Sequence, residues 1–122
     1  MRAQRWGRIV NISSGAARSA GAVGVHYNAS KAGMEGMTRG YAARLVKEGI
    51  TVNAIAPGYI ATEMNTALMQ DEKRAASILE RIPADRWGTP EDFKGGVVYL
   101  ASRASQYVSG EVLTIDGGWM GR

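Results

Sequence analysis

The feature that most constrains the fold is a run of seven mostly apolar residues, 50–56, which ends abruptly at a Pro-Gly pair. This run follows a long segment with helical periodicity, from about residue 26 to residue 47. A β-branched run at 8–12 precedes that helix, and a third apolar run lies at 111–115. Short apolar strands that alternate with helices are typical of buried parallel sheets with right-handed crossovers. We therefore predict a small parallel α/β layer built from these three strands.

The candidate catalytic residues lie between the first strand and the long helix. Tyr27 and Lys31 are four positions apart, so on a helix their side chains share one face. A cation beside a phenol stabilises the phenolate, which makes the phenol a usable general acid or base near neutral pH. Ser14, at the end of the first strand, supplies a hydroxyl that can bond a substrate oxygen. The pattern predicts a site in which the hydroxyls of Ser14 and Tyr27 contact one substrate oxygen, with the Lys31 ammonium beside them.

Three other features are weaker candidates for function. The glycine-rich link at 15–24 occupies the place of a dinucleotide phosphate loop, but its glycines do not fit G-x-G-x-x-G. We interpret it as a loop that borders the active site. His26 has no orienting acid nearby in the sequence, so we expect it beside the site and not as its base. Asp116 begins an Asp-Gly-Gly sequence, and we expect it to hold a turn.

Ser14 followed by Tyr27 and Lys31 resembles the short-chain dehydrogenase/reductase family. Further segments match the family in order and spacing, namely 7–14, 27–33, 52–58, Thr62 and 116–118. The resemblance runs from Gly7 to Gly118 and covers only the second half of such an enzyme. It implies an α/β fold, the C-terminal part of a Rossmann-type doubly wound parallel sheet. Residues 1–122 would form the catalytic half of one NAD(P)-binding domain, with the N-terminal cofactor-loop half absent.

The resemblance also implies the chemistry. It implies an NAD(P)-dependent oxidoreductase that transfers hydride between the nicotinamide of NAD or NADP and a carbonyl or secondary alcohol. Tyr27 would exchange the proton, Ser14 would bond the substrate oxygen, and Lys31 would favour the phenolate and bond the ribose hydroxyls. The segment after the second strand would contact the nicotinamide, through Pro57, Gly58, the backbone of Ile60 and the hydroxyl of Thr62.

Two substrate classes and one non-enzymatic alternative stay open. Segments 54–62, 81–88 and 112–119 look most like the deoxygluconate-type sugar-acid dehydrogenases of the family. Segment 31–56 looks equally like the 3-oxoacyl-carrier-protein reductases. In the alternative, the chain is a truncated, non-catalytic fragment that acts at most as an oligomerisation module.

The long helix carries two stripes at helical spacing. The apolar stripe consists of Met34, Met37, Tyr41 and Leu45. The second stripe consists of small residues, Ala29, Gly33, Gly36 and Gly40. Glycine inside a helix is unfavourable, so we expect the sheet or a symmetry-related helix to lie tightly against the small stripe. The resemblance implies that this helix helps to build the subunit interface of a homo-oligomer, a dimer or tetramer, in the complete enzyme.

Composition and charge argue against other classes of partner. The net charge of +4 reflects arginines that precede Glu35, and no basic stripe or nucleic-acid motif appears, so we expect no nucleic-acid partner. No apolar run approaches the ~18 residues of a membrane span. The absence of cysteine and the single histidine leave no zinc site. We expect a cytoplasmic protein without a metal or a membrane partner.

The remaining segments predict local structure. Residues 63–82 read as one or two short helices, which form either a lid over the substrate or an amphipathic surface hairpin. Thr89 is the expected N-cap of a helix that begins at Pro90 and runs to about Ser102. Gly49 is the expected C-terminal cap of the long helix.

Overall fold

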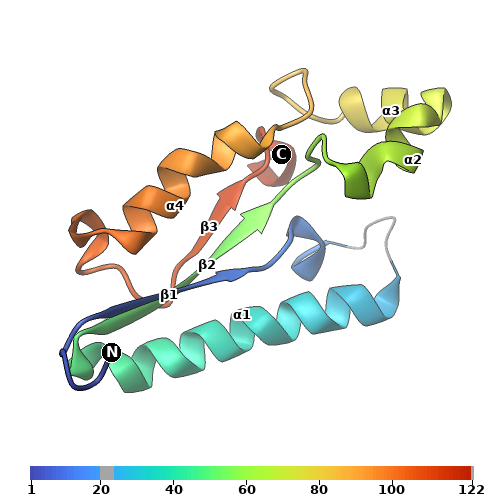
Figure 1. Ribbon diagram of the computed structural model, residues 1–122. Helices are drawn as coiled ribbons and strands as arrows, with labels where there is room; N and C mark the ends of the chain where they lie inside the picture. Colours follow the sequence, from blue (N-terminus) through green and yellow to red (C-terminus); the bar gives the residue numbers. More distant parts are fainter. Residues whose placement is uncertain (20–23, 122) are drawn as a thin grey trace.

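The computed structural model describes residues 1–19 and 24–121, within which the strands form one three-stranded parallel sheet (Figure 1). The strands are β1 (Gly7–Ile12), β2 (Ile50–Pro57) and β3 (Val112–Ile115), in the order β1-β2-β3. β2 is central and pairs in parallel with both neighbours. The predicted parallel α/β layer is therefore confirmed.

The middle of β2 forms the core of the layer. Val52, Ala54 and Ile55 are at most 1% exposed, as expected for a strand covered on both faces. Asn53 is also fully buried, and its side-chain amide donates a hydrogen bond to the Val108 carbonyl oxygen at 3.0 Å. Its amide oxygen accepts a hydrogen bond of 3.0 Å from the backbone N–H of Glu111. The buried amide thus fastens the segment that leads into β3 to the central strand.

Helices cover both faces of the sheet, which is the doubly wound arrangement. In Figure 1, α1 (Val25–Leu45) lies along one face and α4 (Lys94–Ala101) along the other. A turn of 3₁₀ helix, Val46–Glu48, extends α1, and Gly49 ends it with a φ of 77°, in the left-handed region that glycine favours. The predicted cap at Gly49 is confirmed.

The face that α1 turns toward the sheet is more polar than either predicted stripe. Its buried residues are Glu35, Thr38 and Ala42. The Thr38 hydroxyl oxygen accepts a hydrogen bond of 2.9 Å from the side-chain amide of Asn11 in β1. Because these polar groups find partners on the sheet side, the helix can bury them.

The two predicted stripes of α1 are largely open. Met37 and Tyr41 are 45% and 49% exposed. Among the described residues, a Cβ atom added at Gly33, Gly36 or Gly40 would meet nothing within 4 Å. The first of the two expected partners of the glycines, the sheet, is therefore wrong, because α1 contacts the sheet through another face.

The connections contain short helices. α2 (Thr66–Gln70) and α3 (Glu72–Leu79) follow β2, which confirms the prediction of one or two helices in 63–82. Single turns of 3₁₀ helix occur at Gly15–Ala17, Glu63–Asn65, Pro90–Phe93, Arg103–Ser105 and Trp119–Gly121. Across the described parts of the chain, we find no helix with the length and apolar character that a bilayer crossing requires.

A network of charges and caps begins the α4 region. Thr89 and Pro90 occupy the predicted positions, but the first turn is 3₁₀, so α4 itself begins at Lys94. The backbone N–H of Thr89 donates a hydrogen bond of 2.7 Å to Asp92, and the Arg86 guanidinium makes two hydrogen bonds of 2.8 Å to the same carboxylate. The Arg86 hydrogen bond, followed by that of Thr89, holds the pKa of Asp92 well below its ordinary value.

β1 lies at an edge of the described sheet. The backbone N–H of Gly7 donates to the Gly49 carbonyl oxygen and that of Ser13 to the Ile55 carbonyl oxygen, so the odd-numbered residues of β1 face β2. Alternate residues of a strand point their backbone groups to opposite sides. The backbone groups of the even-numbered residues therefore face the edge, where Ile12 is 51% exposed.

Candidate active site

A cavity of about 740 Å³ opens at the carboxyl ends of β1 and β2. Ligands bind at this position in open α/β sheets. Every residue predicted for the site lines this cavity: Ser14, Tyr27, Lys31, Pro57, Gly58, Ile60 and Thr62. The structure therefore brings together side chains that the sequence distributes over three separate segments.

Ser14 caps the 3₁₀ turn Gly15–Ala17 that follows β1. Its Oγ accepts a hydrogen bond of 3.2 Å from the backbone N–H of Ala16. Because a hydroxyl that accepts one hydrogen bond can still donate another, this capping bond leaves the Ser14 proton usable toward a ligand. The cap also fixes where the hydroxyl oxygen lies.

Tyr27 and Lys31 lie one turn apart at the beginning of α1, as predicted. The Lys31 ammonium nitrogen is 5.6 Å from the centre of the Tyr27 ring. The same nitrogen donates a hydrogen bond of 2.8 Å to the carbonyl oxygen of Ile12, the last residue of β1. The lysine thus brings a positive charge between the phenol and the end of the strand.

The segment that follows β2 is held in a defined shape by Gly88. The Ala61 N–H donates to the Gly88 carbonyl oxygen at 2.8 Å, and the Gly88 N–H donates to the Tyr59 carbonyl oxygen at 3.0 Å. These bonds use backbone groups on either side of Ile60, so the Ile60 N–H points the other way. Asn65 also donates from its side chain to the Ile60 carbonyl oxygen at 2.7 Å.

Aromatic side chains gather beside this segment. The Tyr59 ring lies edge-on to Trp119 at 4.8 Å and to Trp87 at 5.6 Å between ring centres. The Arg81 guanidinium lies over the Trp119 ring at 4.2 Å. Both Tyr59 and Trp119 line the cavity. The C-terminal turn therefore contributes an aromatic wall that sequence reasoning did not assign to the site.

The weaker candidates fall largely as expected. Asp116 holds a turn, because its two carboxylate oxygens accept hydrogen bonds of 2.9 Å from the N–H groups of Gly118 and Met120. The beginning of the glycine-rich link does border the cavity, whereas its residues 20–23 lie outside the described part of the chain. His26 is exposed and is not among the residues that line the cavity.

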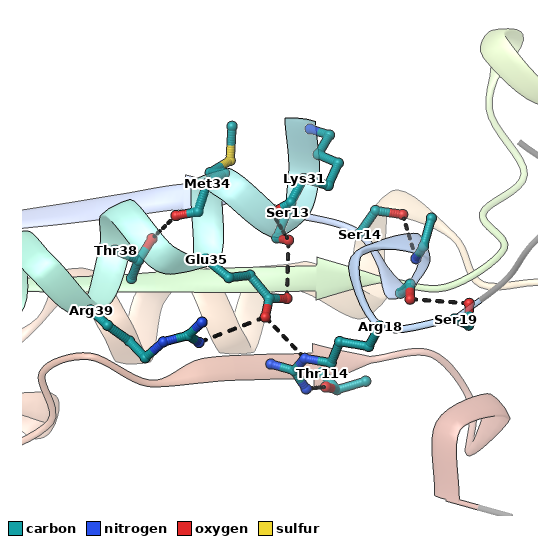
Figure 2. Close-up of polar contacts among 12 residues, drawn as sticks. Ser13, Ser14, Arg18, Ser19, Lys31, Met34, Glu35, Thr38, Arg39 and Thr114 are labelled. Carbon is teal, nitrogen blue, oxygen red and sulfur yellow. Dashed lines mark hydrogen bonds and ion pairs between the residues drawn. The ribbon is translucent and has the colours of Figure 1, made fainter. Parts of the chain in front are cut away.

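A polar network that the sequence did not predict lies beside Ser14 (Figure 2). Ser13 and Glu35 are 2% and 4% exposed, and the Ser13 hydroxyl donates a hydrogen bond of 3.2 Å to Glu35 Oε1. Arg18 Nε lies 3.1 Å from Glu35 Oε2. The available signal was that Glu35 follows Lys31 by one helical turn, which places the two residues on the same side of α1.

The sequence is similar to known proteins over nearly its whole length. A family model described as enoyl-(acyl carrier protein) reductase matches residues 1–120. The 2-dehydro-3-deoxy-D-gluconate 5-dehydrogenase of Escherichia coli is 50% identical over 116 residues, which cover 95% of this chain and 46% of that protein. The 3-oxoacyl-(acyl-carrier-protein) reductase of Rickettsia bellii is 42% identical over 120 residues, which cover 98% of this chain and 49% of that protein.

The fold also closely matches those of solved structures. A gluconate 5-dehydrogenase from Burkholderia cenocepacia, crystallised with NADP and tartrate, superposes with a TM-score of 0.96 at 36% identity. That comparison covers 99% of this chain and 48% of the other. The chain spans about half the length of the curated relatives that it matches. Motif order, fold and the three comparisons agree that the chain belongs to the short-chain dehydrogenase/reductase family.

Proposed function

We propose that the complete protein is an NAD(P)-dependent oxidoreductase that transfers hydride between a nicotinamide and a carbonyl or secondary alcohol carbon. The observation that carries the proposal is the single cavity that collects Ser14, Tyr27, Lys31 and the segment after β2. The relative from Burkholderia cenocepacia binds NADP, which favours the same class of cofactor here. Residues 1–122 then form the catalytic half of the cofactor-binding domain.

The nicotinamide, when bound, supplies or accepts the hydride. In the reducing direction, Tyr27 gives its phenolic proton to the substrate oxygen as the carbonyl carbon gains hydride. Ser14 donates a hydrogen bond to that oxygen while negative charge develops on it. Lys31 stabilises the resulting phenolate and bonds the ribose hydroxyls, for which its ammonium has two N–H donors besides the one that it gives to the Ile12 carbonyl oxygen.

The segment after β2 fits the nicotinamide carboxamide. The bonds to Gly88 occupy the carbonyl oxygen of Tyr59 and the N–H of Ala61, so the Ile60 N–H faces away from Gly88, and Ile60 lines the cavity. Thr62 adds a hydroxyl to the same lining. An N–H donor and a hydroxyl together match the oxygen and the amino group of a carboxamide. Pro57 and Gly58 line the same cavity.

For the substrate, we favour a sugar acid. The E. coli relative that shares 50% identity acts on 2-dehydro-3-deoxy-D-gluconate, and the reductase relative from Rickettsia bellii, which acts on an acyl-carrier-protein substrate, shares 42%. A 3-oxoacyl substrate is therefore the second candidate. A complete version of the enzyme should turn over 2-dehydro-3-deoxygluconate faster than a 3-oxoacyl thioester. The reverse ranking would move the assignment to the reductases.

The first test is titration of the purified, monodisperse chain with NADPH and NADH, followed by nicotinamide fluorescence. Saturable binding would support the enzyme assignment and would justify the substrate comparison. No binding by a folded chain would instead support the alternative of a non-catalytic fragment. In that case, an oligomerisation module would be the remaining function. The exposed face of α1 that carries Met37 and Tyr41 would then be its contact surface.

The same exposed face supports a homo-oligomer in the complete enzyme. A second helix can approach closely where Gly33, Gly36 and Gly40 leave space, and exposed Met37 and Tyr41 would then be covered. Sedimentation equilibrium of the complete enzyme should give a dimer or tetramer, and a monomer at micromolar concentration would contradict this.

A further inference from the structure

Glu35 is a buried carboxylate for which the proposed reaction has no use. It is 4% exposed and lies on the sheet-facing side of α1, one helical turn after Lys31. Carboxylates are almost never buried to this extent unless they are paired and hydrogen-bonded. The partners of Glu35 therefore indicate what its burial achieves.

Both carboxylate oxygens of Glu35 are bonded to the loop that carries Ser14 (Figure 2). Oε1 accepts the Ser13 hydroxyl at 3.2 Å, and Oε2 accepts Arg18 Nε at 3.1 Å. Ser13 immediately precedes Ser14, and Arg18 follows the 3₁₀ turn that Ser14 caps. Glu35 is thus attached to the chain on both sides of Ser14.

Further bonds connect the same loop to the sheet and to the helix. The backbone N–H of Ser13 donates to the Ile55 carbonyl oxygen at 2.7 Å, and Arg18 donates to Thr114 Oγ1 in β3 at 3.5 Å. The Ser13 hydroxyl also lies 3.4 Å from the backbone carbonyl oxygen of Lys31. The turn that carries Ser14 is therefore fixed against α1, β2 and β3 together.

The hydrogen bonds from Ser13 and Arg18 to Glu35, which we call the clamp, address a specific problem of this site. Ser14 and Tyr27 are thirteen positions apart on different elements, so covalent connection does not set the distance between their hydroxyls. A displacement of ~1 Å can cost about 100-fold in rate when two groups must act on one atom. An ion pair whose arginine is 38% exposed, in contrast, adds little net stability.

We propose that Glu35 is a positioning residue, which acts through Ser13 and Arg18 to fix the Ser14 hydroxyl relative to Tyr27 and Lys31. The proposal rests on the proposed function, because it assumes that these three groups act on one substrate oxygen. It assigns no contact between Glu35 and the substrate. The clamp itself is a property of the chain and can be measured without turnover.

The chain offers a matched control for the Arg18 contact. Arg39 lies one turn after Glu35 on α1, and its Nη1 is 3.8 Å from the same Oε2. Arg18→Met and Arg39→Met each remove one cation beside this carboxylate, and both side chains are partly exposed, at 38% and 59%. Only Arg18 belongs to the Ser14 loop. The pair therefore separates positioning of the loop from neutralisation of charge.

The test on the chain is amide hydrogen exchange measured by NMR. The Ala16 N–H reports directly on the clamp because it donates to Ser14 Oγ. We expect Arg18→Met to speed its exchange on the order of tenfold, with Ile55 in β2 unchanged, and Arg39→Met to leave it within about twofold. Arg18→Lys, which keeps one donor, should restore most of the protection. Equal effects of the two Met variants, or no effect of Arg18→Met, would overturn the proposal.

The corresponding test in a complete version of the enzyme separates positioning from stability. Arg18→Met should lower kcat by about 10- to 100-fold with the KM for the cofactor within about twofold, whereas Arg39→Met should leave both nearly unchanged. Parallel losses in kcat and in unfolding midpoint for both variants would show a merely structural role. If the unsubstituted enzyme shows no turnover, the proposed function fails, and the exchange measurement still decides whether the clamp exists.

Discussion

A Cβ atom at Gly58 would lie 2.6 Å from the Cβ atom of Asp116, so the segments that leave β2 and β3 are in direct backbone contact. Real Cβ atoms do not approach this closely, and Asp116 cannot move away because both its carboxylate oxygens hold the following turn. We expect Gly58→Ala to destabilise the fold by about 1–3 kcal/mol, as measured by urea unfolding. Gly95→Ala is the control, because a Cβ there meets nothing within 4 Å among the described residues. Equal destabilisation by both would contradict the contact.

The role of Tyr27 in proton transfer can be tested by removal of its hydroxyl. In a complete version of the enzyme, Tyr27→Phe should lower kcat by about 10²- to 10⁴-fold, the usual contribution of general acid–base catalysis. Tyr107→Phe is the control, since Tyr107 is fully exposed and lies outside both the cavity lining and the exposed face of α1. Steady-state NADPH oxidation gives both values. Turnover of Tyr27→Phe within a few-fold of the unsubstituted enzyme would show that another group carries the proton.

Lys31 should contribute to cofactor affinity as well as to rate. Lys31→Met removes an ammonium that lies beside the Tyr27 ring, and the loss of charge-assisted bonds to ribose should raise the Kd for NADPH by about tenfold or more. Fluorescence titration of a complete version of the enzyme with NADPH measures this change in Kd. Lys47→Met, an exposed change at the far end of the same helix, should leave the Kd unaltered. An unchanged Kd for Lys31→Met would show that Lys31 does not bind the cofactor and that its role is confined to stabilising the Tyr27 phenolate.

The Arg86–Asp92 pair predicts a particular acid dependence of stability. Its hydrogen bonds lower the pKa of Asp92 in the folded state below the ordinary value of about 3.9, so the stabilisation is present above that pH and disappears as the pH falls further. Asp92→Asn should therefore be less stable than the unsubstituted chain at pH 7, with the difference shrinking below about pH 4. Thermal unfolding across pH measures the difference.

A neighbouring carboxylate provides the control for that experiment. Glu91 pairs with Lys94 at 2.7 Å, but both side chains are more than two-thirds exposed, at 67% and 73%. Exposed pairs of this kind contribute little to stability. Glu91→Gln should thus unfold almost like the unsubstituted chain at every pH. A loss at pH 7 as large as that of Asp92→Asn would indicate general charge effects rather than the cap.

Local features of the fold could be predicted because their causes are local. A strand stopped by Pro-Gly, a glycine cap at Gly49 and the Thr89-Pro90 start each depend on residues a few positions apart. The gathering of Ser14, Tyr27 and Thr62 also followed from a general rule, since the carboxyl ends of parallel strands meet at one edge.

What escaped prediction depends on partners that are distant in the sequence. Glu35 is buried only because Arg18 and Ser13 satisfy it, and Asn53 only because Val108 and Glu111 do. A hydrophobic pattern assigns such polar residues to the surface. It therefore did not identify the side of α1 that faces the sheet, where Glu35, Thr38 and Ala42 are buried.

The position of β1 at the sheet edge has a consequence for the catalytic lysine. The carbonyl oxygen of Ile12 faces that edge, and it is the oxygen to which the Lys31 ammonium donates. A further strand laid in parallel against β1 would bring its own N–H groups to the same row of carbonyls. Lys31 would then share its acceptor or give it up. Extension of the sheet and the Lys31 hydrogen bond thus compete for one oxygen atom, and extension would leave the ammonium available to other acceptors.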